Sequence, residues 1–177
     1  QYNKSFKFLK KLNGLEKSHK NYSVRYLYSV INSGNYKEAL HFSRKLEKQQ
    51  LDSFESLLII GVFYLKNSNL DLAKKYFLKA KNIFSKLNNK KLMMAANGNL
   101  AIVYPNLNQP EKAIKLFLEN IDYYKNNNDI VRLSNSFANL GDLYNSIENY
   151  EKSLIYSQKA LDIFQKYNHT EGIYTAL

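Results

Sequence analysis

The chain has 177 residues, of which 45% are hydrophobic and 14% aromatic, and it has only six Gly and two Pro, which excludes a disordered or collagen-like protein. It has no Cys, which excludes disulfides and thiolate zinc sites, and no apolar run of about 18 residues, so we expect no membrane span in this segment. The formal net charge of +11 is typical of nucleic-acid-binding proteins. However, only three of the 26 Lys and Arg residues are Arg, and the lysines occur on almost every predicted helix face. We therefore predict a solvated lysine surface.

Apolar residues at helical spacing divide the chain into one short helix followed by four helix pairs. Residues 2–13 are predicted to form a lone second helix, because Tyr2 and Leu12 stand at the same spacing as Tyr36 and Leu46 in a later one. The four pairs are predicted at residues 20–50, 53–88, 91–128 and 130–168, and a further first helix is predicted to start at residues 170–177. Residues 1–177 are therefore interpreted as a single array and, because terminal repeats normally carry polar caps, as a fragment of a longer array or regulator.

The pairs repeat in sequence at an offset of about 40 residues. The segment Asn139–Tyr144 matches Asn99–Tyr104, and Gly61–Tyr64 fills the same columns one repeat earlier. The first pair follows at a shorter offset of about 34 residues, from Ala39 to Ala73. The second helices keep the register with a small-residue column and an aromatic column, formed by Ala73, Ala113 and Ser153 and by Phe84, Tyr124 and Phe164. Such a register predicts hairpins that bury one another.

Short polar turns are predicted between the helices. Asn is a favoured N-cap and also tolerates the left-handed backbone that ends a helix. The predicted N-caps of second helices are Asn35, Asn69, Gln109 and Asn149, and the predicted helix-ending residues are Asn88, Asn128 and Asn168. Pro110 suits the first position of a helix. Pro105 falls at the close of a first helix, which it is predicted to bend or shorten.

These columns resemble the tetratricopeptide repeat family, whose pattern asks for Leu-Gly-x-x-Tyr and then a small residue, an aromatic residue and Ala at helical spacing. Three units carry the resemblance: Phe137, Leu140, Gly141, Tyr144, Ser153 and Ala160; Leu100, Ala101, Tyr104, Ala113 and Phe117; and Gly61, Tyr64, Ala73, Phe77 and Ala80. The chain departs from it at Asn120, where Ala is usual, at Ser157, where an aromatic residue is usual, and in a weak first unit with Leu27 and Val30. The resemblance implies an all-α fold, a right-handed α-solenoid of stacked antiparallel hairpins. The repeat length is similar to that of the elongated subclass in regulators, peptide-receptor transcription factors and sensor arrays.

No convergent set of titratable residues indicates an active site. His19, His41 and His169 fall in different repeats, and the Asp and Glu residues stand mainly at helix starts, where capping explains them. No Gly-rich phosphate-binding loop is present. We therefore predict a protein that is not an enzyme, with no catalytic residue, no metal and no cofactor.

Glycine and tyrosine within the helices are interpreted as packing residues. Gly98 and Gly141 lie inside helical pattern, where close helix packing is the simplest account. The column Tyr64, Tyr104 and Tyr144 is interpreted as core rather than as a platform on which bases stack.

The resemblance also implies a binding surface. In this family first helices line a concave face, and an Asn just before the Leu-Gly pair often contacts a peptide backbone. By that resemblance Asn99 and Asn139 would point into the groove one repeat apart, with Asn135 one turn earlier and Asp142 nearby. A carboxamide offers a donor and an acceptor together, which matches a peptide unit of any sequence.

Another binding mode of the family, a basic clamp on acidic C-terminal tails, is not predicted. The columns that would hold its lysines carry Leu58, Gly98 and Ala138. A role as a chaperone co-factor is therefore not expected.

Three functional hypotheses follow, in decreasing order of support. The first is a non-catalytic scaffold that binds a protein or an extended peptide in its concave groove. The second is the sensory or dimerising part of a signalling or transcriptional regulator whose effector domain lies outside this segment. The third is a basic nucleic-acid binder. The array ends are candidate surfaces for self-association, and the absence of a leader at Gln1 favours a cytoplasmic protein while leaving export open.

Overall fold

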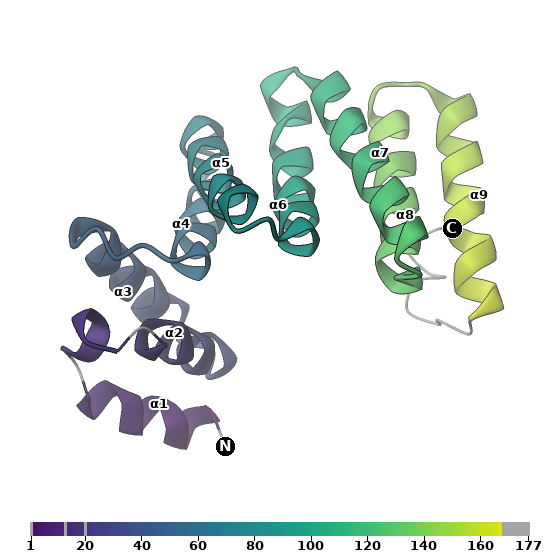
Figure 1. Ribbon diagram of the computed structural model, residues 1–177. Coiled ribbons are helices and arrows are strands. Elements are labelled where there is room, and N and C mark those ends of the chain that lie inside the picture. The colour runs from purple at the N-terminus through teal and green to yellow at the C-terminus, as the bar shows by residue number, and fades with distance from the viewer. Residues whose placement is uncertain (1, 13, 20, 168–177) are drawn as a thin grey trace. The chain divides into compact units, whose positions relative to one another are not determined.

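The computed structural model describes residues 2–12, 14–19 and 21–167, and within them it contains α-helices and short 3-10 helices but no strand (Figure 1). The predicted all-α helical-repeat fold is therefore confirmed. Contacts divide the chain into two compact units with their boundary between Asn88 and Asn89, and each is described by itself. They are called the N-terminal unit and the C-terminal unit below.

In the N-terminal unit, α2 pairs with α3, α4 pairs with α5, and α1 packs against α2. The elements are α1 (Tyr2–Lys11), the 3-10 helix η1 (Leu15–Lys17), α2 (Tyr22–Asn32), α3 (Tyr36–Lys48), α4 (Phe54–Lys66) and α5 (Leu70–Lys86). The Tyr22 hydroxyl at the start of α2 donates a 2.9 Å hydrogen bond to the Leu9 carbonyl of α1. Phe6 and Leu9 of α1 also pack on the core that α2 and α3 share. The first helix is thus part of this core.

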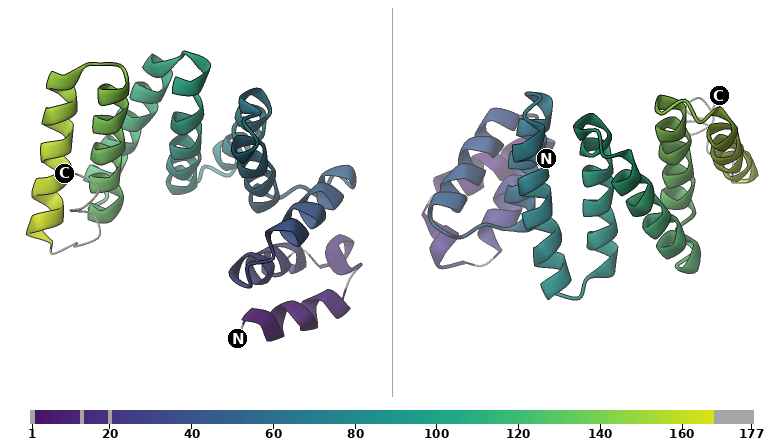
Figure 2. Two further views of the ribbon diagram at one scale, coloured as in Figure 1. Left: turned by 180° about the vertical axis from the view of Figure 1, so that it is seen from behind. Right: turned by 90° about the horizontal axis from the view of Figure 1, so that it is seen from above.

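In the C-terminal unit, α6 pairs with α7, α8 pairs with α9, and α7 also packs against α8. The elements are α6 (Lys90–Val103), the 3-10 helix η2 (Pro105–Leu107), α7 (Pro110–Asn126), α8 (Ile130–Ser146) and α9 (Tyr150–Lys166). Both views of Figure 2 show α8 and α9 side by side. As predicted, Pro105 shortens the first helix, because α6 ends at Val103 and the chain continues as η2. Residues 170–177, where a further helix was predicted, lie outside the described residues, as do Asn168 and His169.

The turns between successive helices share one backbone geometry. In six turns a residue with positive φ follows a helix and stands directly before the next N-cap residue; these residues are Gly34 (78°), Ser68 (56°), Asn88 (49°), Asn108 (54°), Asn128 (54°) and Glu148 (61°). The exception is Gln50 (57°), which follows α3 but does not directly precede the N-cap Ser53 of α4. The Asn149 amide then donates to the Tyr144 carbonyl five residues earlier, at 2.9 Å, which is the Schellman arrangement. The predicted left-handed backbone at Asn88 and Asn128 is therefore confirmed.

The predicted N-cap side chains fulfil that role at two of four positions. The Asn69 and Asn149 side chains accept hydrogen bonds from amides three residues on, at 3.3 and 3.2 Å. Asn35 and Gln109 also stand at the predicted N-cap position, but their side chains accept no such bond. The Asn35 side chain instead turns back toward the end of α2, where its amide group donates to the Ser33 hydroxyl at 2.9 Å.

The buried side chains of the second helices follow the predicted columns. In these columns Ala73, Ala80, Ala113 and Ala160 are fully buried and Phe84, Tyr124 and Phe164 are buried, whereas Ser153 is only half-buried. Asn120, which stands where Ala is usual, is only 4% exposed. The periodicity in the sequence is therefore the periodicity of the core.

The tyrosine column packs the two helices of a hairpin together, as predicted. Tyr64 of α4 stacks on Tyr76 of α5 with ring centroids 5.5 Å apart. In the same way, Tyr144 of α8 stacks on Tyr156 of α9, with centroids 5.5 Å apart and planes within 7°. Tyr76 and Tyr144 are buried, whereas Tyr64, Tyr156 and the third column member, Tyr104, are half-buried.

Two of the glycines differ sharply in their surroundings. A Cβ on Gly141 would lie 2.6 Å from the Ser157 hydroxyl and 3.2 Å from the Ser157 backbone nitrogen, so close helix packing is confirmed there. No atom lies within 4 Å of a Cβ on Gly98, so the packing interpretation is wrong at that position. The residue of α9 that approaches Gly141 is Ser157, which stands where an aromatic residue is usual. In the same columns of the N-terminal unit, a Cβ on Gly61 would meet the Phe77 ring instead.

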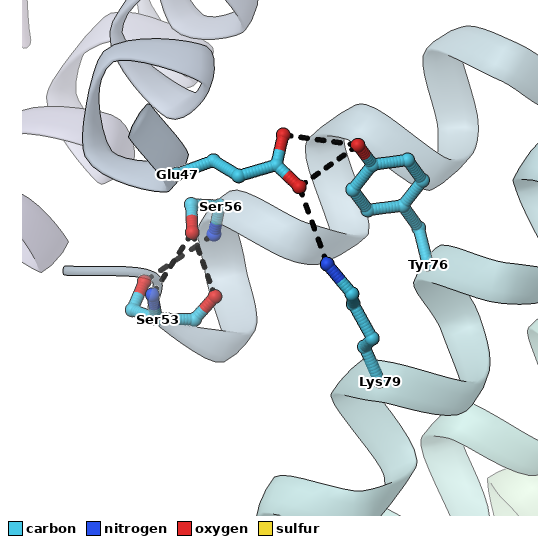
Figure 3. Close-up of polar contacts among 5 residues, drawn as sticks. All are labelled: Glu47, Ser53, Ser56, Tyr76 and Lys79. Atoms are coloured by element: carbon cyan, nitrogen blue, oxygen red, sulfur yellow. Dashed lines mark hydrogen bonds and ion pairs between the residues drawn. The ribbon is translucent and has the colours of Figure 1, made fainter. Parts of the chain in front are cut away.

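A polar cluster connects α3 to α5 across two hairpins of the N-terminal unit (Figure 3). The Tyr76 hydroxyl lies 2.9 Å from both carboxylate oxygens of Glu47, and the Lys79 ammonium donates to the same carboxylate at 3.3 Å. Burial and the hydrogen bond to Glu47 raise the pKa of Tyr76 to about 12. Close by, Ser53 and Ser56 form a reciprocal capping box that starts α4.

We expect Tyr76→Phe to lower the free energy of unfolding by about 1–2 kcal/mol, because a hydrogen bond to a charged acceptor is lost. Since the pKa of Tyr76 is raised on folding, this contribution is complete below pH about 10 and disappears as the pH rises through about 12. Urea unfolding at neutral and alkaline pH, with Glu47→Gln to close a double-mutant cycle, measures it. Tyr64→Phe is the matched control and should be nearly neutral. A Tyr76→Phe effect that is independent of pH over this interval would contradict the assignment.

Candidate functional site

A hollow of about 230 Å³ lies within the C-terminal unit, between the first helices α6 and α8. Phe117 of α7 contributes to its floor, because the second helix of the first hairpin lies behind the two first helices. The lining residues are Ala101, Ile102, Pro105, Phe117, Asn139, Asp142, Leu143 and Ser146. One wall, from α6 and η2, is therefore apolar, and the other, from α8, is mostly polar, with Leu143 as its apolar member.

Two of the four residues predicted for binding line this hollow. Asn139 and Asp142 stand one turn apart on α8, and both are exposed. Neither makes a hydrogen bond or ion pair with another residue in the part of the chain that the structure describes. Their polar atoms are thus available to a ligand.

The other two predicted residues lie on the same helices but do not line the hollow. Asn135 is exposed on α8, one turn before Asn139. Asn99 is half-buried on α6, and its side-chain amide donates to the Ala95 carbonyl of its own helix at 3.3 Å. That bond is long, so a ligand could replace it at small cost.

The start of α8 is held by an ion pair. The Asp129 carboxylate accepts a 2.6 Å hydrogen bond from the Arg132 guanidinium and also caps the helix through the Arg132 amide. Burial alone would raise the pKa of Asp129, but these hydrogen bonds outweigh it and hold the pKa below its ordinary value. The helix that carries Asn139 and Asp142 is therefore anchored at its first turn.

The N-terminal unit has a hollow at the corresponding place, and its chemistry is different. This open hollow of about 370 Å³ lies between α2, α3 and α4, and its α4 wall carries Ile59 and Val62. In the repeat register these residues stand where α8 has Asn139 and Asp142. This apolar wall was not predicted, because only the Asn residues of the column were considered, although the same column in the earlier repeat shows Ile59 and Val62 directly.

Ile102, Pro105 and Phe117 were also missed as lining residues. They are apolar residues in helical pattern, which the sequence does not distinguish from core. In the structure Ile102 is exposed beside α8, whereas Phe117 is buried at the floor of the hollow.

The described residues contain no group of three or more His, Asp or Glu side chains placed to hold a metal ion. Of the predicted isolated histidines, His41 is exposed on α3 and His19 lies in the segment before α2. No described helix is both long and apolar enough to cross a membrane.

Comparison with known families decides the classification. Residues 92–166 match one sequence model of the tetratricopeptide repeat, residues 54–86 match a second, and together the matches cover more than half of the chain. The chain belongs to the tetratricopeptide repeat (TPR) family. The resemblance predicted from the Leu-Gly-x-x-Tyr columns is thus confirmed, and proteins of this family serve as protein-interaction scaffolds. No curated protein matches the chain at a significant level.

Several solved structures share the fold. One is a signal transduction ATPase with numerous domains (STAND) from Pyrococcus horikoshii, which carries a TPR sensor. It is 20% identical to this chain, with a TM-score of 0.80, and the match covers 99% of this chain and 28% of that one. BtubC from P. vanneervenii is 16% identical with a TM-score of 0.71, over 93% of this chain and 71% of its own. YrrB, a TPR protein with an unusual peptide-binding site, is 19% identical with a TM-score of 0.68, over 98% of this chain and 82% of its own. At these identities the likeness establishes the fold alone.

Proposed function

We propose that this TPR array is a non-catalytic scaffold that binds an extended segment of a protein partner along the first helices α6 and α8. The observation that carries the proposal is the hollow between these helices, where Asn139 and Asp142 present polar atoms that no other described residue uses. The predicted repeats at residues 20–50, 53–88, 91–128 and 130–168 are proposed as the units of the array.

The chemistry of the hollow suits a peptide backbone. The Asn139 carboxamide can donate to a peptide carbonyl and accept from a peptide N–H, and the Asp142 carboxylate can accept from a second N–H. Ile102 and Pro105 on the opposite wall provide apolar contact for a side chain. Each backbone hydrogen bond contributes only about 0.5–1.5 kcal/mol, so affinity also requires side-chain contacts.

The test is selection of peptides from an unbiased display library against the purified chain, followed by measurement of dissociation constants. We expect Asn99→Ala/Asn139→Ala to weaken selected peptides about tenfold, since two amides that contact the peptide backbone are lost. Circular dichroism should show an unchanged helical content, because one residue is exposed and the other half-buried.

The matched control is Asn126→Ala/Asn127→Ala, which removes two exposed amides at the end of α7 in the same unit. It should leave affinity unchanged. Equal affinity of the wild type and the Asn99→Ala/Asn139→Ala variant for every selected peptide would reject the backbone contacts.

A second candidate is a sensory array within a larger signalling protein. The likeness to the STAND protein, whose TPR segment is named a sensor, favours it. A peptide that binds this segment should then change the activity of an effector domain on the same polypeptide. Binding without such a change, measured on the full-length polypeptide, would favour the simple scaffold.

A further inference from the structure

The apolar hollow of the N-terminal unit is open on one side and has the size of a small ligand pocket. Its volume of about 370 Å³ lies near the lower end of the range of about 300–1,000 Å³ for such pockets. Residues from three helices line it, among them Ile31 of α2, Lys37 of α3, and Ile59, Val62, Phe63 and Lys66 of α4. A pocket of this size suits one bulky side chain and its neighbours rather than a folded surface.

The wall formed by α4 explains why this pocket is apolar. In the repeat register, Ile59 replaces the Asn of the later repeats and Val62 replaces Asp142. Val62 is 39% exposed. Burial of its apolar side chain against a ligand would therefore be favourable. The columns that carry polar side chains on α8 therefore carry apolar side chains on α4.

The charges of the pocket are of one sign. Lys37 and Lys66 are exposed lining residues, and no Asp or Glu is among the lining. Arg44 adds a third cation beside the pocket, since its guanidinium carbon lies 4.9 Å from the centroid of the Phe63 ring. A hydrocarbon pocket bordered by cations is complementary to an apolar group with acidic neighbours.

We infer that this pocket binds a bulky apolar side chain of an extended peptide whose adjacent residues are acidic. The inference rests on the proposed function and deepens it, because it names the class of peptide. The apolar side chain supplies binding energy by leaving water, and the acidic neighbours select the partner and accelerate its association.

The test uses three short synthetic peptides with a fluorescent label and otherwise uncharged polar residues. The first carries one Leu between Glu residues, the second replaces that Leu by Ser, and the third replaces the Glu residues by Lys. Fluorescence anisotropy with the whole chain should show that the first peptide binds at least about tenfold more tightly than the other two. Its affinity should also fall as salt is added, because exposed ion pairs are screened.

Variants of the protein then locate the binding. Val62→Glu should weaken the Leu/Glu peptide by at least about tenfold, since it places a carboxylate in the pocket. Lys37→Gln/Lys66→Gln alters only exposed side chains and should weaken it and reduce the salt dependence. The control is Leu78→Glu, an equally exposed apolar position of α5 that lies outside the pocket.

Each contrary result has a distinct meaning. Equal binding of the Leu and Ser peptides, or unchanged binding by Val62→Glu, overturns the pocket assignment. If display-selected peptides nonetheless depend on Asn139, the proposed function stands and only this inference fails. If the wild type self-associates and Val62→Glu does not, the pocket holds a second copy of this chain and the inference is also overturned. Failure of all three peptides to bind at millimolar concentration rejects it outright.

Discussion

Gly141→Ala is expected to lower the free energy of unfolding by about 1–2 kcal/mol. The added Cβ would lie 2.6 Å from the Ser157 hydroxyl, 3.2 Å from the Ser157 nitrogen and 3.3 Å from the Ser153 carbonyl oxygen. The hydroxyl can rotate away, but the two backbone atoms can move only if α9 shifts. Overpacking of this kind costs about 1–3 kcal/mol, and the better helix propensity of Ala offsets up to about 1 kcal/mol.

Gly98→Ala is the matched control, since it makes the same chemical change in another first helix. Nothing lies within 4 Å of the new Cβ, so the propensity gain stands alone and stability should rise by about 0.5–1 kcal/mol. Denaturant unfolding followed by circular dichroism compares the two. Gly141→Ala/Ser157→Ala should recover part of the loss by removing the hydroxyl. Equal effects of the two Gly→Ala changes would contradict the close approach of α8 and α9.

Either Asn97→Leu or Asn120→Ala alone is expected to destabilise the protein by about 1–3 kcal/mol, whereas the double variant Asn97→Leu/Asn120→Ala is not. Asn97 is fully buried on α6 and Asn120 is 4% exposed on α7. The Asn97 amide donates to the Asn120 side-chain oxygen at 3.2 Å, and the Asn120 amide donates to the Met94 carbonyl at 3.0 Å. The Asn97 side-chain oxygen has no hydrogen-bond partner among the described residues. Removing one member leaves the other buried and less well satisfied.

The neighbouring repeats supply the apolar replacement. The columns of Asn97 and Asn120 hold Leu57 and Ala80 in the N-terminal unit, where both belong to one apolar cluster. The Asn97 amide also donates to the Glu119 carboxylate at 3.3 Å, but Glu119 is exposed and can be hydrated instead. Asn97→Leu/Asn120→Ala should therefore unfold at a free energy equal to or above that of the wild type, because the two buried amides are replaced together. Additive losses in the double variant, measured by the same denaturant unfolding, would show that the pair contributes net stability.

The sequence predicted the hairpins because their signal is local and repeated. The columns of Ala and aromatic residues, the helix-ending Asn88 and Asn128, and the effect of Pro105 all follow from residue type and spacing. Ser68 and Glu148 take the same left-handed backbone as Asn88, yet neither residue type favours it. Their conformation is imposed by the packing of the helices that they join.

The candidate site was only partly predictable, because its shape depends on distances between helices. Gly98 and Gly141 look alike in sequence, and only the position of Ser157 separates them. The pairing of Asn97 with Asn120 spans two helices and carries no local pattern. The apolar wall at Ile59 and Val62 was readable from the repeat columns but needed the structure to show that it lines a pocket.

The most direct measurement of the central claim is amide chemical-shift mapping of the chain with a display-selected peptide. The account predicts that the largest shifts occur on the first helices, on α6 near Ile102 and on α8 from Asn139 to Ser146. Asn99→Ala/Asn139→Ala should reduce these shifts at equal peptide concentration. Shifts confined to the second helices α7 and α9 would contradict the proposal that this TPR array binds its partner along the first helices.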